Sequence, residues 1–237
     1  MSIAKQVILL LLCLIGYSLD ISAQTEKVKN LPYADYRQVH FGFLLGMHTQ
    51  DIAFSHTGFV GENGESWYAE QPGFSPGFSV GLLASLSIIE QLELRLTPTM
   101  HFGNRYITLK ESESSAFEKQ DIKANIVAIP LNVKYSSKRI NNYRPYITAG
   151  ISPSIDLSKK KNTPIVLNRF DFAIELGLGL DLYLPYFKLI PELRFSFGLV
   201  DLIKHDRPDL KDPNMIKYTK GIESAKSRSV SLIFYFE

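Results

Sequence analysis

The feature that most constrains the fold is an alternation of apolar and polar side chains that recurs eight times along the chain. Successive side chains of a β-strand point to opposite faces, so a period of two residues predicts strands with two unlike faces. The segment 169–182 alternates most regularly, with phenylalanine, isoleucine and leucine on one face and charged residues, alanine and glycine on the other. Eight such segments predict an all-β fold. Because eight is an even number, they also suit a closed antiparallel barrel.

The connections between these segments alternate between long and short. They span 49–76, 89–91, 103–121, 137–143, 158–168, 183–186 and 201–227. Outer-membrane barrels have long external loops and short periplasmic turns. We therefore place the barrel at residues 39–237 and expect both termini on the periplasmic side.

Five prolines fall in or beside the expected strands. Proline lacks the backbone donor of a strand ladder, so we expect these residues at strand ends or bulges. They are Pro98, Pro130, Pro145, Pro153 and Pro191.

The content of the two faces decides between a soluble barrel and a membrane barrel, because alternation alone fits both. The apolar face carries no charge, and the opposite face is rich in glycine, namely Gly42, Gly46, Gly81, Gly150, Gly177, Gly179 and Gly198. Small residues suit a crowded interior, and a long apolar face suits lipid. We predict an eight-stranded antiparallel transmembrane β-barrel, an up-and-down meander whose apolar face points outward.

Residues 1–23 are typical of a secretory signal peptide, with an apolar run that ends in small residues. We expect cleavage after Ala23, which leaves 24–38 as a short polar periplasmic segment, either a tether to inner components or disordered. Cys13 is the only cysteine and lies in the part removed, so we expect no thiol chemistry. The net charge of +2 is scattered, and we expect no nucleic-acid partner.

Several stretches resemble a known family. They read KYSSKRINNYRPYI at 134–147, DFAIELGLGLDLYLPYFKLIPELRFSFGL at 171–199 and SLIFYFE at 231–237, with HFGFLLGMHTQD at 40–51 and PGFSVGLL at 76–83. Together they resemble the PorT family of the type IX secretion machinery of Bacteroidetes over nearly the whole mature chain. The resemblance implies an outer-membrane component needed for export of targeted cargo, and for gliding in motile species, with other secretion subunits as partners. It implies no catalytic residues.

The expected inward faces carry cations and carboxylates in near balance. They are Arg95, Lys134, Arg144, Arg169, Lys188, Arg194 and Arg228, with Glu93, Asp156, Asp171, Glu175, Asp181 and Glu192. The interior of an eight-stranded barrel is just wide enough to be filled by side chains, and unpaired buried charge is costly. We therefore predict a structural network of ion pairs. A proton or ion path, and acid and base work by Glu175, Asp181 and Glu192, are the alternatives.

The sequence gives less support to a metal site or to a lipid-modifying active site. His40, His48 and His101 face inward, but nothing orders them into ligand spacing on one element, so we expect neither a metal nor a cofactor. A lipid-modifying enzyme is the third functional hypothesis. It needs a nucleophile and a base within reach of each other toward the bilayer, and the outward faces offer no serine or histidine.

The long loops hold the remaining candidates. Trp67, Tyr68 and Tyr218 either contact a partner or fold over the rim. The lysines at 159–161 either form a solvated loop tip or bind lipopolysaccharide phosphates. Our first hypothesis is a non-enzymatic type IX component, surrounded by outer-membrane lipid and lipopolysaccharide. The second is a free-standing small barrel that serves as an adhesin or envelope stabiliser.

Overall fold

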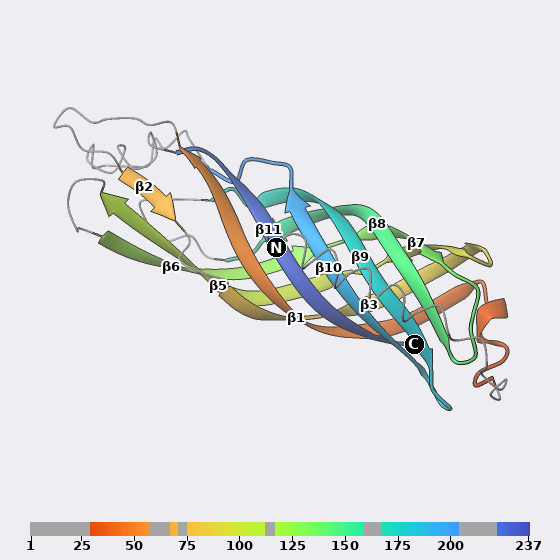
Figure 1. The fold of residues 1–237 in the computed structure, drawn as a ribbon. Coiled ribbons are helices and arrows are strands. Elements are labelled where there is room, and N and C mark those ends of the chain that lie inside the picture. Colours follow the sequence, from red (N-terminus) through yellow and green to blue (C-terminus); the bar gives the residue numbers. More distant parts are fainter. Residues whose placement is uncertain (1–28, 57–66, 71–74, 112–116, 159–166, 204–221) are drawn as a thin grey trace, which may run out of the picture.

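The computed structural model describes residues 29–56, 67–70, 75–111, 117–158, 167–203 and 222–237. They form one antiparallel sheet, preceded by a short 3-10 helix, η1 (Ala34–Tyr36) (Figure 1). The strands are β1 (Val39–His56), β2 (Trp67–Glu70), β3 (Ser75–Ile89), β4 (Leu92–Leu96), β5 (Thr99–Glu111), β6 (Phe117–Ala128), β7 (Leu131–Ser136), β8 (Tyr143–Asp156), β9 (Phe170–Tyr183), β10 (Lys188–Gly198) and β11 (Ile222–Phe236). Among the described residues, no helix is long and apolar enough to cross a membrane.

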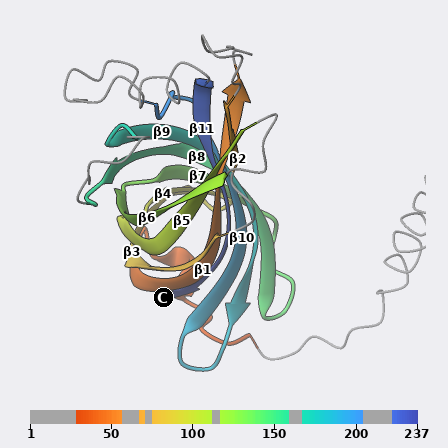
Figure 2. The same ribbon diagram turned by 90° about the vertical axis from the view of Figure 1, so that its left-hand side faces the viewer.

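The sheet closes into a ring. In order around it lie β1, β3, the consecutive pair β4 and β5, the pair β6 and β7, then β8, β9, β10 and β11, which returns to β1. The closing seam runs from Phe43 opposite Phe236 to His56 opposite Ile222. Figure 2 shows the strands curving around a common interior. The eight-stranded up-and-down meander predicted from the sequence is confirmed.

Prolines interrupt two positions of the ring and sit inside two other strands. The third expected strand is divided into β4 and β5 at Pro98, and the fourth into β6 and β7 at Pro130. Pro145 and Pro153 lie within β8 and Pro191 lies within β10, so placing these three at strand ends or bulges was wrong. The strands tolerate them because a proline loses only its donor: the Pro153 carbonyl still accepts the backbone N–H of Ile129 at 3.0 Å.

The two ends of the barrel differ. We call the end where β1 begins and β11 ends the turn end; it carries the short connections 90–91, 137–142 and 184–187. We call the opposite end the loop end; it carries 57–74, 112–116, 157–169 and 199–221. The strands at the loop end are longer than expected. β1 continues to His56 and β11 begins at Ile222, so the expected connections 49–76 and 201–227 were drawn too long.

The extension was missed because the apolar side chains change faces there. Within the ring the apolar residues of β1, such as Met47, point outward. Toward the loop end Ile52 is buried in an apolar cluster with Leu167, Leu202, Ile203, Ile222 and Ala225. The run of outward apolar positions in β1 therefore ends at Met47, although the strand itself continues to His56.

The faces of the ring are arranged as a lipid-facing barrel requires. Phe41 is 73% exposed and Leu82 64%, whereas Arg95 is 1% exposed and Lys134 is fully buried. A continuous apolar exterior is unfavourable in water and matches the apolar band of transmembrane barrels. The outward orientation of the apolar face is confirmed, and the buried charged residues lie in the interior.

Candidate functional site

An ion-paired layer fills the barrel interior. It is built from inward positions two residues apart, Glu93 and Arg95 on β4 and Glu192 and Arg194 on β10, which the period of two places on one face of each strand. Lys134 comes from β7, the strand next to β4, where it stands opposite Glu93. All five side chains are buried. Their charges must therefore be balanced within the barrel.

Lys134 and Asp181 form the tightest pair of the part of this layer nearer the turn end. The Lys134 ammonium donates to both carboxylate oxygens of Asp181, at 2.7 and 2.9 Å, and lies 3.4 Å from Glu93. Arg95 adds a contact of 3.6 Å to Glu93 and one of 3.9 Å to Asp181. Lys188 lies 3.8 Å from Asp181. Three cations therefore surround one fully buried carboxylate.

Arg194 and Glu192 form the core of the part nearer the loop end. The guanidinium donates to one Glu192 oxygen through Nε at 2.8 Å and Nη2 at 2.6 Å, and lies 3.0 Å from Glu175. The Tyr146 hydroxyl donates to the other Glu192 oxygen at 2.8 Å. Arg95 joins the two parts, because it lies 3.5 Å from Glu192 and over the Tyr146 ring, 4.9 Å from its centroid.

Inward glycines make room for this layer. A Cβ placed on Gly179 would lie 2.2 Å from the Tyr146 ring, and one on Gly177 would lie 2.3 Å from the Thr148 hydroxyl. Tyr146 stands opposite Gly179 in the β8 and β9 register. The missing side chain on β9 is therefore what lets the tyrosine reach Glu192.

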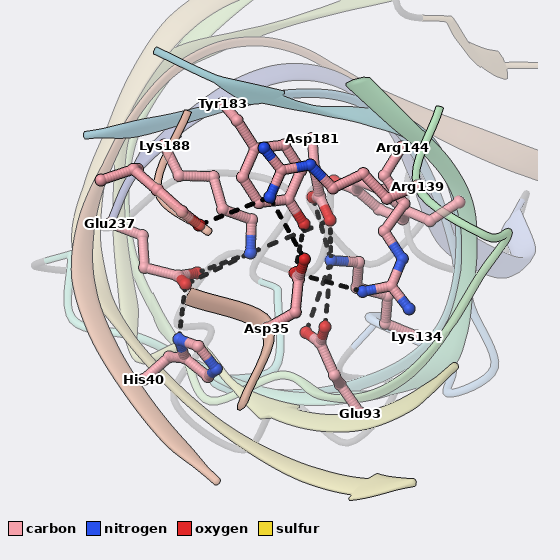
Figure 3. A network of polar contacts seen from close by, with 12 residues as sticks. Asp35, His40, Glu93, Lys134, Arg139, Arg144, Asp181, Tyr183, Lys188 and Glu237 are labelled. Carbon is pink, nitrogen blue, oxygen red and sulfur yellow. Dashed lines mark hydrogen bonds and ion pairs between the residues drawn. The ribbon is translucent and has the colours of Figure 1, made fainter. Parts of the chain in front are cut away.

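A second polar cluster closes the turn end (Figure 3). Asp35 of η1 lies between Arg139 and Arg144, at 3.3 and 3.5 Å, and accepts a hydrogen bond from the Tyr183 hydroxyl at 2.5 Å. Beside it, the C-terminal Glu237 pairs with His40. Asp35 and Arg139 escaped the sequence analysis because they lie outside the alternating segments.

The pair at Glu237 is tight. Its carboxylate lies 2.6 Å from His40 Nδ1 and 3.2 Å from the Lys188 ammonium. Burial raises the pKa of Glu237, but the hydrogen bond from His40 and the charge of Lys188 outweigh burial and lower that pKa below its usual value. Glu237 is therefore held as a carboxylate.

A small polar cavity of about 60 Å³ lies on the loop side of Arg194. Its lining includes Asp171, His48 and His101, with several serines. Ser79 joins the two histidines, at 2.7 Å from His48 Nδ1 and 2.8 Å from His101 Nδ1. A polar space of this size holds a few water molecules.

The structure separates the residues proposed from the sequence into groups. Glu93, Arg95, Lys134, Glu175, Asp181, Glu192 and Arg194 lie in the ion-paired layer, Arg144 lies at the turn end, and Asp171 lines the cavity. Trp67 and Tyr68 lie in β2, paired with Glu111 and Lys110 of β5. Tyr218 and the lysines at 159–161 fall outside the described residues.

The three inward histidines do not converge on one point. His48 and His101 meet near the loop end, whereas His40 lies at the turn end beside Glu237. In the part of the chain that the structure describes, no group of three or more histidine, cysteine, aspartate or glutamate residues is arranged to hold a metal ion.

Comparison with known proteins gives one family. The model of a family described as outer membrane protein beta-barrel domain matches residues 22–204. No curated protein matches the chain. Among solved structures, the chain is similar to the outer membrane protein OprG from Pseudomonas aeruginosa, with 12% identity, a TM-score of 0.49, and 90% of this chain and 98% of that chain covered. Neisserial surface protein A shows 13% identity, a TM-score of 0.42 and coverage of 84% and 98%. Ail of Yersinia pestis shows 10% identity, a TM-score of 0.38 and coverage of 85% and 100%.

Proposed function

This chain belongs to the outer membrane protein beta-barrel domain family, and on that premise we propose that it is a non-enzymatic barrel with a closed interior that works through protein contacts at its ends. The observation that carries the proposal is the ion-paired layer across the interior. An interior filled by buried side chains leaves the two ends as the places for contact.

The closed interior argues against a conduit. Arg95, Lys134, Asp181 and Glu192 are each at most 1% exposed, and together they occupy the middle of an eight-stranded ring. Such a ring has room for side chains but not for a folded protein. The purified barrel should therefore give no steady ion conductance in a planar lipid bilayer, and regular conductance steps would contradict a closed interior.

The orientation follows from the lengths of the connections. In outer-membrane barrels the short turns face the periplasm and the long loops face outward. We place the turn end, with η1 and the C-terminal residue, in the periplasm. On this proposal residues 1–23 are removed on export and 24–38 precede the barrel on the periplasmic side.

We further propose that the barrel is a component of the type IX secretion machinery. The support is the resemblance of SKRINNYRPY, at 137–146, and of the segment 171–199 to the PorT family. The first of these covers the turn between β7 and β8 and the start of β8, and it includes Arg139 and Arg144 at the turn end. A periplasmic position for these residues suits contact with other subunits of a secretion machine.

A deletion of the gene in its own host tests this role. Mass spectrometry of the culture medium and of the periplasm would follow proteins that bear type IX targeting domains. We expect such cargo to vanish from the medium, to accumulate in the periplasm, and to return to the medium when the intact gene is restored. The level of an unrelated outer-membrane protein is the control for general envelope damage.

Unchanged secretion would reject the type IX role and favour a free-standing adhesin or envelope stabiliser. One observation supports that second candidate. β2 pairs with β5, and β5 with β6, beyond the ring at the loop end (Figure 1). On the proposed orientation this sheet extension projects from the cell, where an adhesin would make contact.

A further inference from the structure

We propose that Arg139, Arg144 and Tyr183 form a binding site for a peptide carboxylate at the turn end, and that Asp35 is its exchangeable occupant within the chain. The ligand class is an acidic peptide segment of a periplasmic protein. The periplasmic setting rests on the proposed orientation, whereas the binding site itself does not depend on a role in secretion.

The barrel holds both arginines without help from Asp35. Arg144 donates through Nε to the Ser137 carbonyl at 2.8 Å and through Nη2 to the Glu90 carbonyl. Arg139 donates through Nε to the Asn141 carbonyl at 2.8 Å. Its guanidinium also lies over the ring of Tyr183, 3.6 Å from the centroid. The site is therefore formed before its carboxylate arrives.

Asp35 supplies the charge that the site requires. In the described part of the chain, neither Arg139 nor Arg144 forms an ion pair with another carboxylate. The two side chains are only 10% and 5% exposed. Buried cations without a partner are costly, so a site of this kind attracts a carboxylate. A peptide that replaced Asp35 would have to provide one.

The segment that carries Asp35 places no fully buried side chain against the barrel. η1 contributes no buried residue, and Tyr33 and Tyr36 are 77% and 82% exposed. Besides those of Asp35, the hydrogen bonds that join the segment to the barrel include those of Asn30 to Asn142 and to the Tyr183 carbonyl and those of Arg139 to backbone oxygens of the segment. The backbone N–H of Ser87 also donates to the Gln38 carbonyl at 2.8 Å. Each such bond adds little net stability, and ordering the backbone opposes it. The segment therefore belongs to the parts of the protein that open most easily.

Backbone strain adds to this tendency. Leu31 has a φ of 49°, in the left-handed region that non-glycine residues rarely adopt. The conformation lets its carbonyl accept from Arg139 Nη1 at 3.4 Å and from the backbone N–H of Ala34 at 3.1 Å. Release of the segment relieves the strain at Leu31. This relief lowers the cost of replacing Asp35 by a ligand carboxylate.

A labelled peptide with the sequence of residues 29–38, KNLPYADYRQ, is the probe. It is titrated by fluorescence anisotropy against the full mature chain in detergent micelles, as the wild type and as Asp35→Asn. We expect about tenfold tighter apparent binding to Asp35→Asn, because the competing carboxylate is gone. The peptide with asparagine in place of aspartate should bind at least tenfold more weakly. Equal binding of the two peptides, or no binding of the first to Asp35→Asn, would overturn the proposal.

Two further variants in the Asp35→Asn background separate the site from general charge. Arg139→Gln should abolish binding of the peptide, whereas Lys138→Gln should leave it unchanged. Lys138 is the matched control because it lies on the same turn and its side chain is exposed. Equal losses in the two variants would show that the peptide responds only to net charge and would reject the site.

Trypsin cleavage after Arg37 reports release of the segment in the full chain. Arg37 is exposed, but cleavage of a docked segment requires it to open. We expect several-fold faster cleavage in Asp35→Asn than in the wild type, with the barrel intact by its electrophoretic mobility. Equal rates would show that Asp35 does not hold the segment and would refute its role as occupant. These assays use purified protein, so their failure is distinct from a failure of the secretion experiment.

Discussion

Replacing Asp181 with asparagine tests whether the ion-paired layer holds the barrel together. Asp181 is fully buried and accepts two hydrogen bonds from Lys134, at 2.7 and 2.9 Å. Asparagine keeps the shape of the side chain but removes its charge. Lys134, Lys188 and Arg95 would then share one carboxylate fewer, although all three side chains are buried.

The expected cost follows from the contacts that remain. Removing one partner of a buried ion pair costs about 3–5 kcal/mol, because an uncompensated charge stays behind. Lys134 keeps Glu93 at 3.4 Å, so we expect the lower end, about 3 kcal/mol. The double variant Lys134→Met/Asp181→Leu removes both charges, and apolar replacements of a buried pair are often nearly neutral. It should therefore be more stable than Asp181→Asn.

Urea unfolding of the purified barrel in detergent measures these differences, with the folded fraction read from electrophoretic mobility without heating. A loss of about 3 kcal/mol lowers the midpoint by about 1–3 M for typical urea dependences. A shift of less than about 0.3 M for Asp181→Asn, or a double variant weaker than the single one, would refute the view that the charges are balanced as pairs.

The remaining predictions also use urea unfolding, in lipid vesicles for the Leu178 variants and in detergent for the others. Gly179→Ala places a Cβ 2.2 Å from the ring of Tyr146 and should cost about 1–3 kcal/mol through overpacking, an effect that Tyr146→Leu in the same chain should largely remove. Leu178→Arg puts a charge on the outward face, where Leu178 is 57% exposed, and should cost about 2–4 kcal/mol in a lipid bilayer, whereas Leu178→Phe should be tolerated; equal stability of the two would argue against lipid contact there. The lowered pKa of Glu237 means that its carboxylate stabilises the fold above pH 4.5 and that this stability is lost as the pH falls below 4.5, so the unfolding midpoint of the wild type should fall more steeply in that range than that of Glu237→Gln.

The ring could be predicted from the sequence because a single period governs it. Each strand of a lipid-facing barrel must alternate, and segments such as 169–182 do so without exception. The same rule placed Glu93, Arg95, Glu192 and Arg194 inward before any contact was known, since residues two apart share a face. Which cation meets which carboxylate depends on the register between strands, and no single strand contains that information.

What was missed lies where the period fails. At the loop end the apolar residues around Ile52 point inward, so the outward apolar pattern predicted β1 and β11 too short at that end. Pro145 and Pro191 lie inside strands because their neighbours tolerate a missing donor, which depends on the partner strand and not on the local sequence. Asp35 and Arg139 lie more than a hundred residues apart in segments without alternation, and only the closed ring brings them together.

The ion-paired layer also bears on how such a chain enters a membrane. Strands β4, β7, β9 and β10 carry inward charges that find partners on other strands, as Lys134 does on β4 and β9. A lone hairpin in lipid would expose those charges together with the unpaired backbone groups of its edges, and both are expensive in hydrocarbon. Partly inserted states therefore carry two costs, the exposed charges and the unpaired backbone groups. Both costs disappear when the ring closes, so insertion and ring closure should occur in one cooperative step. The polar interior therefore favours the complete ring over any partial assembly of strands, because only the complete ring pairs all of these charges.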